Sequence, residues 1–271
     1  MQESTAILLD QQRFERWASF TLGSAQLAAA QPGQYVALRC AAAGSYDPLL
    51  RHPLFVATTD ARANTCTLLV SDLDPAYDFL NSQVRGAALN LLGPLGRGWN
   101  VGASVRTLAL IGTAAQASAL FALAHSSVAR GLSVTLALGA PGEDAPAPND
   151  DLQPLIAPPP FLLPAAAEYN LAQGDDPAEA ALSLLDDALL RWADLLAIAL
   201  PVALLPRVAE RVRNVRLQWN RDFAQVAILG AQPDRLACYV GICGACSIDG
   251  RHGRKLVCSD GPVFDLRDLV R

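Results

Sequence analysis

Short apolar runs separated by turn residues fill roughly the first hundred positions of the chain. Segments such as ASFTLGS, GQYVALRC, PLFVATT and TCTLLVS have the length of β-strands, and glycine and proline stand between them. A series of this kind is typical of an antiparallel barrel or sandwich. The pattern therefore predicts an all-β unit from about Thr5 to Asn100.

The pattern changes after about Ser104. SVRTLALIG is a continuous apolar strand, AAQASALFALAHSSVARG is an alanine-rich helix, and SVTLALGA is a second strand. This β–α–β unit implies a parallel sheet. Further along, the pattern predicts a helix over about 178–192, a strand in DLLAIAL, a helix near 202–212 and a strand in NVRLQWN (residues 214–220).

Composition and charge narrow the class of protein. The 271 residues are long enough for two domains, and a net charge of −5 argues against a nucleic-acid-binding face. The longest apolar run, Leu195–Pro206, contains Pro201 and is too short to cross a bilayer. The residues after Met1 show neither a basic segment nor an apolar one, so we expect no secretion and a cytoplasmic location.

Four cysteines near the C-terminus carry the strongest chemical signal. Cys238, Cys243, Cys246 and Cys258 follow the spacing C-x4-C-x2-C-x11-C. The first three match the plant-type arrangement of thiolates around a [2Fe–2S] cluster, and the fourth closes the ligand set. Glycines between the ligands allow the loop to curl around an inorganic core. The spacing predicts a [2Fe–2S] site with these four ligands.

A zinc site and disulfide bonds are two other possible roles of these cysteines, and both fit less well than the cluster. A four-cysteine zinc site usually shows two C-x2-4-C pairs, whereas here three cysteines crowd one loop. Disulfides fit poorly with a reducing cytoplasm. The remaining cysteines, Cys40 and Cys66, lie in apolar, strand-like surroundings and are expected to be small buried side chains.

Five segments carry a resemblance to a known family. They are PGQYVALR (32–39), DPLLRHP (47–53), LLGPLGRGW (91–99), RLACYVGICGACSIDG (235–250) and VCSDGPVFD (257–265). Together with the order of barrel, βαβ unit and cysteine loop, they resemble the electron-transfer subunit of type B dihydroorotate dehydrogenases, within the ferredoxin-reductase-like superfamily. The resemblance spans nearly the whole chain.

The resemblance implies an α+β multidomain fold: an antiparallel β-barrel of FAD-binding type (1–101), a parallel-sheet α/β domain of NAD-binding type (102–232) and a small [2Fe–2S] module (233–271). Electrons in such proteins of pyrimidine biosynthesis pass between a nicotinamide nucleotide, FAD, the cluster and an FMN in a separate catalytic subunit. The positions that correspond to FAD contacts are Arg51, His52, Pro53, Leu54, Leu69 and Val70, and those for NAD contacts are Gly112 and Thr113.

The chain departs from the family where FAD would bind. The Arg-Pro-x-Ser run that holds the flavin ring reads His52-Pro53-Leu54-Phe55, with Arg51 one place early. The glycine-rich turn that cradles the diphosphate is replaced by a stretch with Asp72, Asp74 and Pro75. Carboxylates repel a diphosphate and proline removes an N–H donor, so we expect FAD binding to be weakened or lost.

The nicotinamide motifs have changed as well. The family's glycine-rich G-G-G-x-G-x-A-P turn corresponds to residues 112–119, which read GTAAQASA. The family's Cys-Gly-Pro corresponds to residues 199–201, which read Ala-Leu-Pro. Only Gly112 remains of the first motif's glycines, so side chains occupy space that a dinucleotide needs.

The sequence thus predicts a [2Fe–2S] electron-transfer subunit of an oxidoreductase complex. It is expected to form a hetero-oligomer with a flavin-containing catalytic subunit, without nucleic acid or membrane insertion, and to relay electrons rather than act as a self-sufficient enzyme. Two alternatives stay open: a complete FAD- and NAD(P)H-dependent reductase, and a structural docking subunit that has lost nucleotide binding.

Overall fold

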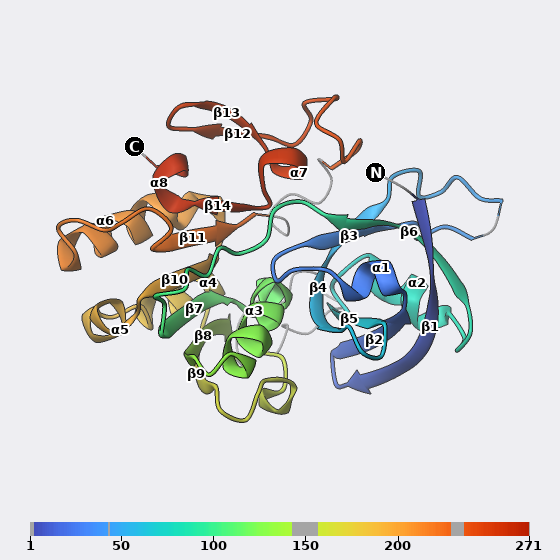
Figure 1. The fold of residues 1–271 in the computed structure, drawn as a ribbon, viewed down its shortest axis with the longest axis horizontal. Coiled ribbons are helices and arrows are strands. Elements are labelled where there is room, and N and C mark those ends of the chain that lie inside the picture. The colour runs from blue at the N-terminus through green and yellow to red at the C-terminus, as the bar shows by residue number, and fades with distance from the viewer. Residues whose placement is uncertain (1–2, 43, 143–156, 229–235, 271) are drawn as a thin grey trace.

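The structure, a computed structural model, describes residues 3–42, 44–142, 157–228 and 236–270. A barrel formed by the N-terminal part lies beside an α/β body, and the C-terminal segment runs along the side where the two meet (Figure 1). Among the described residues, none of the helices has the length and apolar character that crossing a membrane requires.

Antiparallel strands close into the barrel that the N-terminal pattern predicts. They are β1 (Glu3–Phe14), β2 (Trp17–Gly23), β3 (Tyr35–Leu38), β4 (His52–Asp60), β5 (Thr65–Ser71) and β6 (Ala88–Leu95). Their order is β1-β2-β5-β4-β3-β6, and β1 closes the barrel by pairing with β6. Two short helices, α1 (Ala25–Ala28) and α2 (Ala76–Ser82), accompany the strands.

Strand β3 is covered on both of its faces. Val36 and Leu38 pack in the barrel interior, while Tyr35 and Ala37 belong to the apolar cluster that the barrel shares with the α/β body. Successive side chains of a strand point to opposite faces, so the alternation along β3 separates the barrel core from the domain interface. All four side chains are fully buried.

A six-stranded sheet forms the centre of the α/β body. Its strands are β7 (Thr107–Thr113), β8 (Ser133–Pro141), β9 (Glu168–Gly174), β10 (Leu195–Ala199), β11 (Ala224–Ala227) and β14 (Val263–Asp265). The order is β14-β11-β10-β7-β8-β9, and the neighbours from β11 to β9 are parallel, which confirms the parallel sheet that the βαβ unit predicts.

Helices connect the parallel strands. The α-helices are α3 (Ser118–Ala129), α4 (Pro177–Ser183), α5 (Asp187–Trp192) and α6 (Leu205–Val215), and the 3-10 turns are η1 (Ala114–Gln116), η2 (Pro160–Leu162) and η3 (Val202–Leu204). Helix α3 packs against barrel strand β4 and so joins the two bodies.

The C-terminal segment adds a hairpin and two short helices. They are β12 (Ser247–Gly250), β13 (Gly253–Leu256), α7 (Val257–Asp260) and α8 (Leu266–Leu269). Strand β14, between α7 and α8, pairs antiparallel with β11. The segment expected as a separate module therefore also completes the edge of the α/β sheet.

Two local predictions differ from the structure. The helix expected over 178–192 is divided into α4, which ends at Ser183, and α5, which Asp186 caps by accepting the N–H of Leu189 at 2.7 Å. The strand expected at 214–220 is wrong. Helix α6 continues to Val215, Leu217 is 93% exposed, and the strand of this region is β11.

Polar contacts fix the barrel against the α/β body. The indole N–H of Trp99 donates to the carbonyl of Ala119 at 3.1 Å. Asn100 and the buried side chain of Gln225 exchange two hydrogen bonds, of 2.8 and 2.6 Å. Buried polar groups need partners, so these bonds hold the two bodies in one relative position.

Candidate functional site

The four cysteines predicted as ligands come together in two pairs. Cys246 and Cys258 are both buried, and their sulfur atoms lie 3.3 Å apart. Cys238 and the exposed Cys243 form the second pair, in which the backbone N–H of Cys243 lies 3.5 Å from the sulfur of Cys238. Three of the cysteines precede β12, and Cys258 lies on α7.

The loop can wrap its sulfurs because three of its residues adopt left-handed backbone angles. The φ angles are 58° at Tyr239, 79° at Gly241 and 71° at Gly244. Glycine reaches this region without cost. At Gly241 a Cβ atom would also lie 3.1 Å from the hydroxyl of Ser259, so the loop passes close to α7.

Backbone N–H groups of the loop point at the sulfurs. Burial by itself would raise the pKa of Cys238, but three N–H groups of the loop, led by that of Cys243, donate to its sulfur and lower the pKa to about 6. Burial and the neighbouring Cys246 raise the pKa of Cys258 to about 12, although the N–H of Gly241 opposes them. N–H donors favour a thiolate, which is the form that binds a metal.

The paired arrangement fits a two-iron cluster better than one metal ion. In a [2Fe–2S] cluster four thiolates are shared between two irons, whereas a zinc ion gathers all four around one point. The donor set and its division into pairs therefore fit the cluster.

The cysteine loop rests on the barrel. The hydroxyl of Tyr239 donates to the carbonyl of Arg51 at 2.6 Å, and its ring centre lies 6.3 Å from that of Tyr35. Gly96, directly after β6, contacts the C-terminal segment. A Cβ atom at this position would lie 2.4 Å from Pro262, so glycine is required there. The site is thus held between barrel and sheet.

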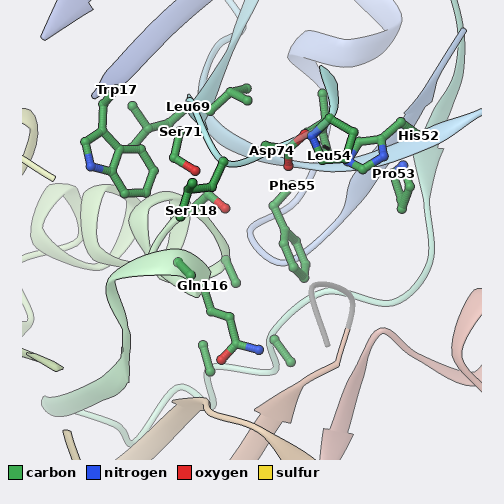
Figure 2. A pocket seen from close by; sticks show the side chains of 17 residues that line it. Trp17, His52, Pro53, Leu54, Phe55, Leu69, Ser71, Asp74, Gln116 and Ser118 are labelled. Carbon is green, nitrogen blue, oxygen red and sulfur yellow. Dashed lines mark ion pairs between the residues drawn. The ribbon is translucent and has the colours of Figure 1, made fainter. Parts of the chain in front are cut away.

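A second feature is a cavity of about 220 Å³ between the barrel and the α/β body (Figure 2). Five of the six predicted FAD-type positions line it: His52, Pro53, Leu54, Leu69 and Val70. The sixth, Arg51, lies elsewhere, because its guanidinium pairs with Glu3 and donates to the carbonyl of Asn90.

The two aspartates that replace the family's glycines are already engaged. Asp74 lies 2.9 Å from the ring nitrogen Nε2 of His52 and accepts the N–H of Ala76 at 2.8 Å, at the start of α2. Asp72 pairs with Arg16 at 2.8 Å. The positions of the diphosphate-binding turn thus carry the chain's own carboxylates, and the side chains of Arg16 and His52 contact them.

These residues do not fit the diphosphate of FAD. A phosphate 4–5 Å from Asp74 would meet a repulsion of about 3–4 kcal/mol at an effective dielectric of 20. The cavity is also smaller than the ~300–1,000 Å³ of common small-molecule sites. Phe55 replaces the family's serine and points into the space between β4 and Gln116 (Figure 2).

The nicotinamide-type positions have packing roles. A Cβ atom at Gly112 would lie 2.9 Å from the carbonyl of Ala199, so close contact between β7 and β10 explains this glycine. Thr113 is nearly buried, and its hydroxyl lies 3.4 Å from the side-chain oxygen of Gln116. Neither residue is among those that line the cavity of Figure 2.

Sequence reasoning missed three residues that shape these sites. Tyr35 lies in PGQYVALR, a segment noted in the sequence only for its resemblance to the family. Its hydroxyl is buried next to the cysteines. Arg16 is 56 positions from its partner Asp72, and no local pattern signals a pair at that separation. Tyr239 could have been noticed as the one aromatic residue within the cysteine spacing.

Comparison with known proteins agrees with the C-terminal site. Residues 234–270 match the family model described as the iron-sulfur cluster binding domain of dihydroorotate dehydrogenase B. The electron transfer subunit of dihydroorotate dehydrogenase B (NAD(+)) from Bacillus caldolyticus is 29% identical over 248 residues, which cover 89% of this chain and 87% of that protein. The subunit of the same name from Bacillus cereus (strain Q1) is 25% identical with the same coverage.

Solved structures share the fold. A NADH-dependent reduced ferredoxin-NADP oxidoreductase superimposes with a TM-score of 0.69 at 19% identity, covering 97% of this chain and 89% of that one. The ferredoxin reductase of carbazole 1,9a-dioxygenase gives a TM-score of 0.58 at 15% identity, over 83% of this chain and 66% of that one. The fold is ferredoxin-reductase-like, and the resemblance inferred from the motifs is confirmed.

Proposed function

We propose that this chain, which is similar to dihydroorotate dehydrogenase B electron transfer subunits over 89% of its length, is the iron–sulfur electron-transfer subunit of such a complex. The observation that carries the proposal is the division of Cys238, Cys243, Cys246 and Cys258 into two sulfur pairs on one loop and α7. These four residues are the proposed ligands of a [2Fe–2S] cluster.

A [2Fe–2S] cluster, when bound, takes up and returns one electron at a time. The protein's part is to hold the thiolates and to set their surroundings. Cys246 and Cys258 are buried and would hold the inner side, while Cys243 is exposed and would hold the side facing a partner. Electron exchange over a short gap requires such an exposed side. Bond chemistry on the substrate then belongs to a flavin in the partner subunit.

The proposal includes a cytoplasmic location and a hetero-oligomer. None of the six cysteines, all of which lie in the described part of the chain, forms a disulfide, which is compatible with a reducing compartment. The partner we propose is a dihydroorotate dehydrogenase-type catalytic subunit that carries its own flavin. No electron step is assigned to FAD in this chain, because Asp74 and Phe55 occupy its binding position.

Anaerobic purification of the chain with its catalytic subunit tests the proposal. We expect about two irons and two sulfides per chain, a visible spectrum that dithionite bleaches, and reduction of the cluster when dihydroorotate is added to the complex. Zinc in place of iron would refute the cluster. Reduction of the isolated chain by NADH alone would instead favour a complete reductase.

A further inference from the structure

One buried hydroxyl beside the cysteines has no partner. Tyr35 on β3 is fully buried, and within the described residues its hydroxyl oxygen makes no hydrogen bond. A buried phenol normally finds an acceptor, because an unpaired polar group in the interior is costly. An orphaned hydroxyl in this position therefore indicates an acceptor that a bound group supplies.

The surroundings of Tyr35 identify that group. Its ring lies 6.3 Å from the ring of Tyr239, next to Cys238 in the sequence, and its Cε1 atom is 3.0 Å from where a Cβ of Gly96 would stand, against Pro262. Burial, and then the nearby Cys258, Tyr239, Cys246 and Cys238, raise the pKa of the Tyr35 hydroxyl above its ordinary value. The phenol thus faces the cysteine site from the barrel side.

We propose that the Tyr35 hydroxyl donates a hydrogen bond to a sulfur atom on the Cys246–Cys258 side of the bound cluster and thereby raises its reduction potential. This inference rests on the proposed function, since it requires the cluster. Tyr35 acts as a positioning and tuning residue and not as a ligand.

The direction of the effect follows from charge. Reduction adds one negative charge to the cluster, so a donor to its sulfur stabilises the reduced form more than the oxidised form. A neutral phenol carries one O–H donor and is fixed by burial, so the bond needs no rearrangement during electron transfer. The same contact links the barrel to the redox site.

Replacement of Tyr35 by phenylalanine tests the proposal, because it removes the oxygen and keeps the ring. We expect iron and sulfide contents equal to those of the natural chain. The ratio of reduced to oxidised cluster at a fixed potential should fall by up to about tenfold, which corresponds to ~59 mV for one electron. The shift of the Fe–S stretching bands between H₂O and D₂O in resonance Raman spectra should also decrease.

Tyr169→Phe is the control. Its partly buried hydroxyl donates to the carbonyl of Pro158 at 3.5 Å, and it lies on β9, at the opposite edge of the sheet from β14. This variant should keep the potential and the isotope shift of the natural chain. Incorporation of 3-fluorotyrosine at position 35 makes a more acidic donor and should raise the potential, and it decides the question if the phenylalanine variant binds no iron.

Equal potentials in the natural chain, the Tyr35→Phe variant and the fluorotyrosine protein would overturn the role of Tyr35 while leaving the cluster assignment intact. Failure of the natural chain itself to hold iron and sulfide would refute the proposed function. The two failures are therefore distinguished by the metal content of the unmodified protein.

Discussion

At the scale of single residues, the four cysteines differ in exposure but serve one proposed group. Cys246→Ser or Cys258→Ser removes a buried thiolate, and an alcohol is a much weaker ligand for iron. We expect iron to fall from about two per chain to a small fraction, with loss of the visible absorption. Metal analysis of anaerobically purified protein measures this.

Cys66→Ser and Cys40→Ser are the controls for this prediction. Both positions belong to or pack against the barrel core, and burial raises the pKa of each thiol to about 12, so neither forms a thiolate readily. The two variants should keep the full iron content. Loss of iron in both of them, equal to that of Cys246→Ser, would contradict the assignment of ligands.

Asp194 gives a pH-dependent contribution to stability. Its carboxylate accepts the N–H of Arg106 at 2.8 Å and the N–H of Thr107 at 3.1 Å, and these bonds lower the pKa of Asp194 below its ordinary value. A carboxyl with a lowered folded-state pKa stabilises the fold above its unfolded-state pKa of about 3.9 and loses that contribution as pH falls through the lower value.

Asp194→Asn should therefore destabilise the protein by about 1 kcal/mol at pH 7, because solvent weakens an exposed charged hydrogen bond. Urea unfolding from pH 7 down to pH 3 measures the difference, which should shrink below about pH 4. Asp175→Asn, at an exposed position, is the control and should leave the unfolding midpoint unchanged. A constant difference at every pH would contradict the role of the charge.

At the scale of elements, the turn between β5 and α2 carries aspartates where the family that the motifs resemble has glycines. We expect the natural chain to leave gel filtration without bound FAD. The triple variant His52→Arg, Phe55→Ser, Asp74→Gly restores the family's residues and should gain a flavin absorption band near 450 nm. Titration with FAD, followed by gel filtration and absorbance, measures both.

Asp74→Gly also removes the carboxylate that accepts the N–H of Ala76, which costs about 1 kcal/mol. Thermal unfolding of the single variant shows whether the fold survives before binding is measured. If the natural chain retains one FAD per chain after gel filtration, the side chains of this site do not exclude FAD, and the prediction is refuted.

The elements show what sequence alone could and could not predict. The barrel and the parallel sheet follow from apolar runs, because their strands are buried on at least one face. Strand β9 escaped notice because it lies at the sheet edge and Leu171 is 42% exposed, so it has no apolar run. The partners of Asp72 and Asp74 also could not be predicted, since pairing across a fold leaves no local pattern.

At the scale of the whole molecule, the exposed side of the cysteine site combines two loops. Ile242 is 84% exposed beside Cys243, and Leu49 is 77% exposed on the loop before β4. The hydrogen bond from Tyr239 to the carbonyl of Arg51 joins these loops. Large apolar side chains that remain in solvent around a redox site are expected at a subunit interface.

Ile242→Asp should therefore weaken association with the catalytic subunit by about 2 kcal/mol, or ~30-fold in Kd, without changing the iron content. Calorimetric titration of the two subunits measures the affinity. Leu217→Asp is the matched control, because Leu217 is 93% exposed but lies between α6 and β11, in the α/β body. Equal losses in both variants would mean that added charge, and not this surface, governs assembly. An unchanged Kd for Ile242→Asp would mean that the electron-transfer interface does not include the cysteine loop. The exposure of Cys243 would then not be explained by contact with a partner.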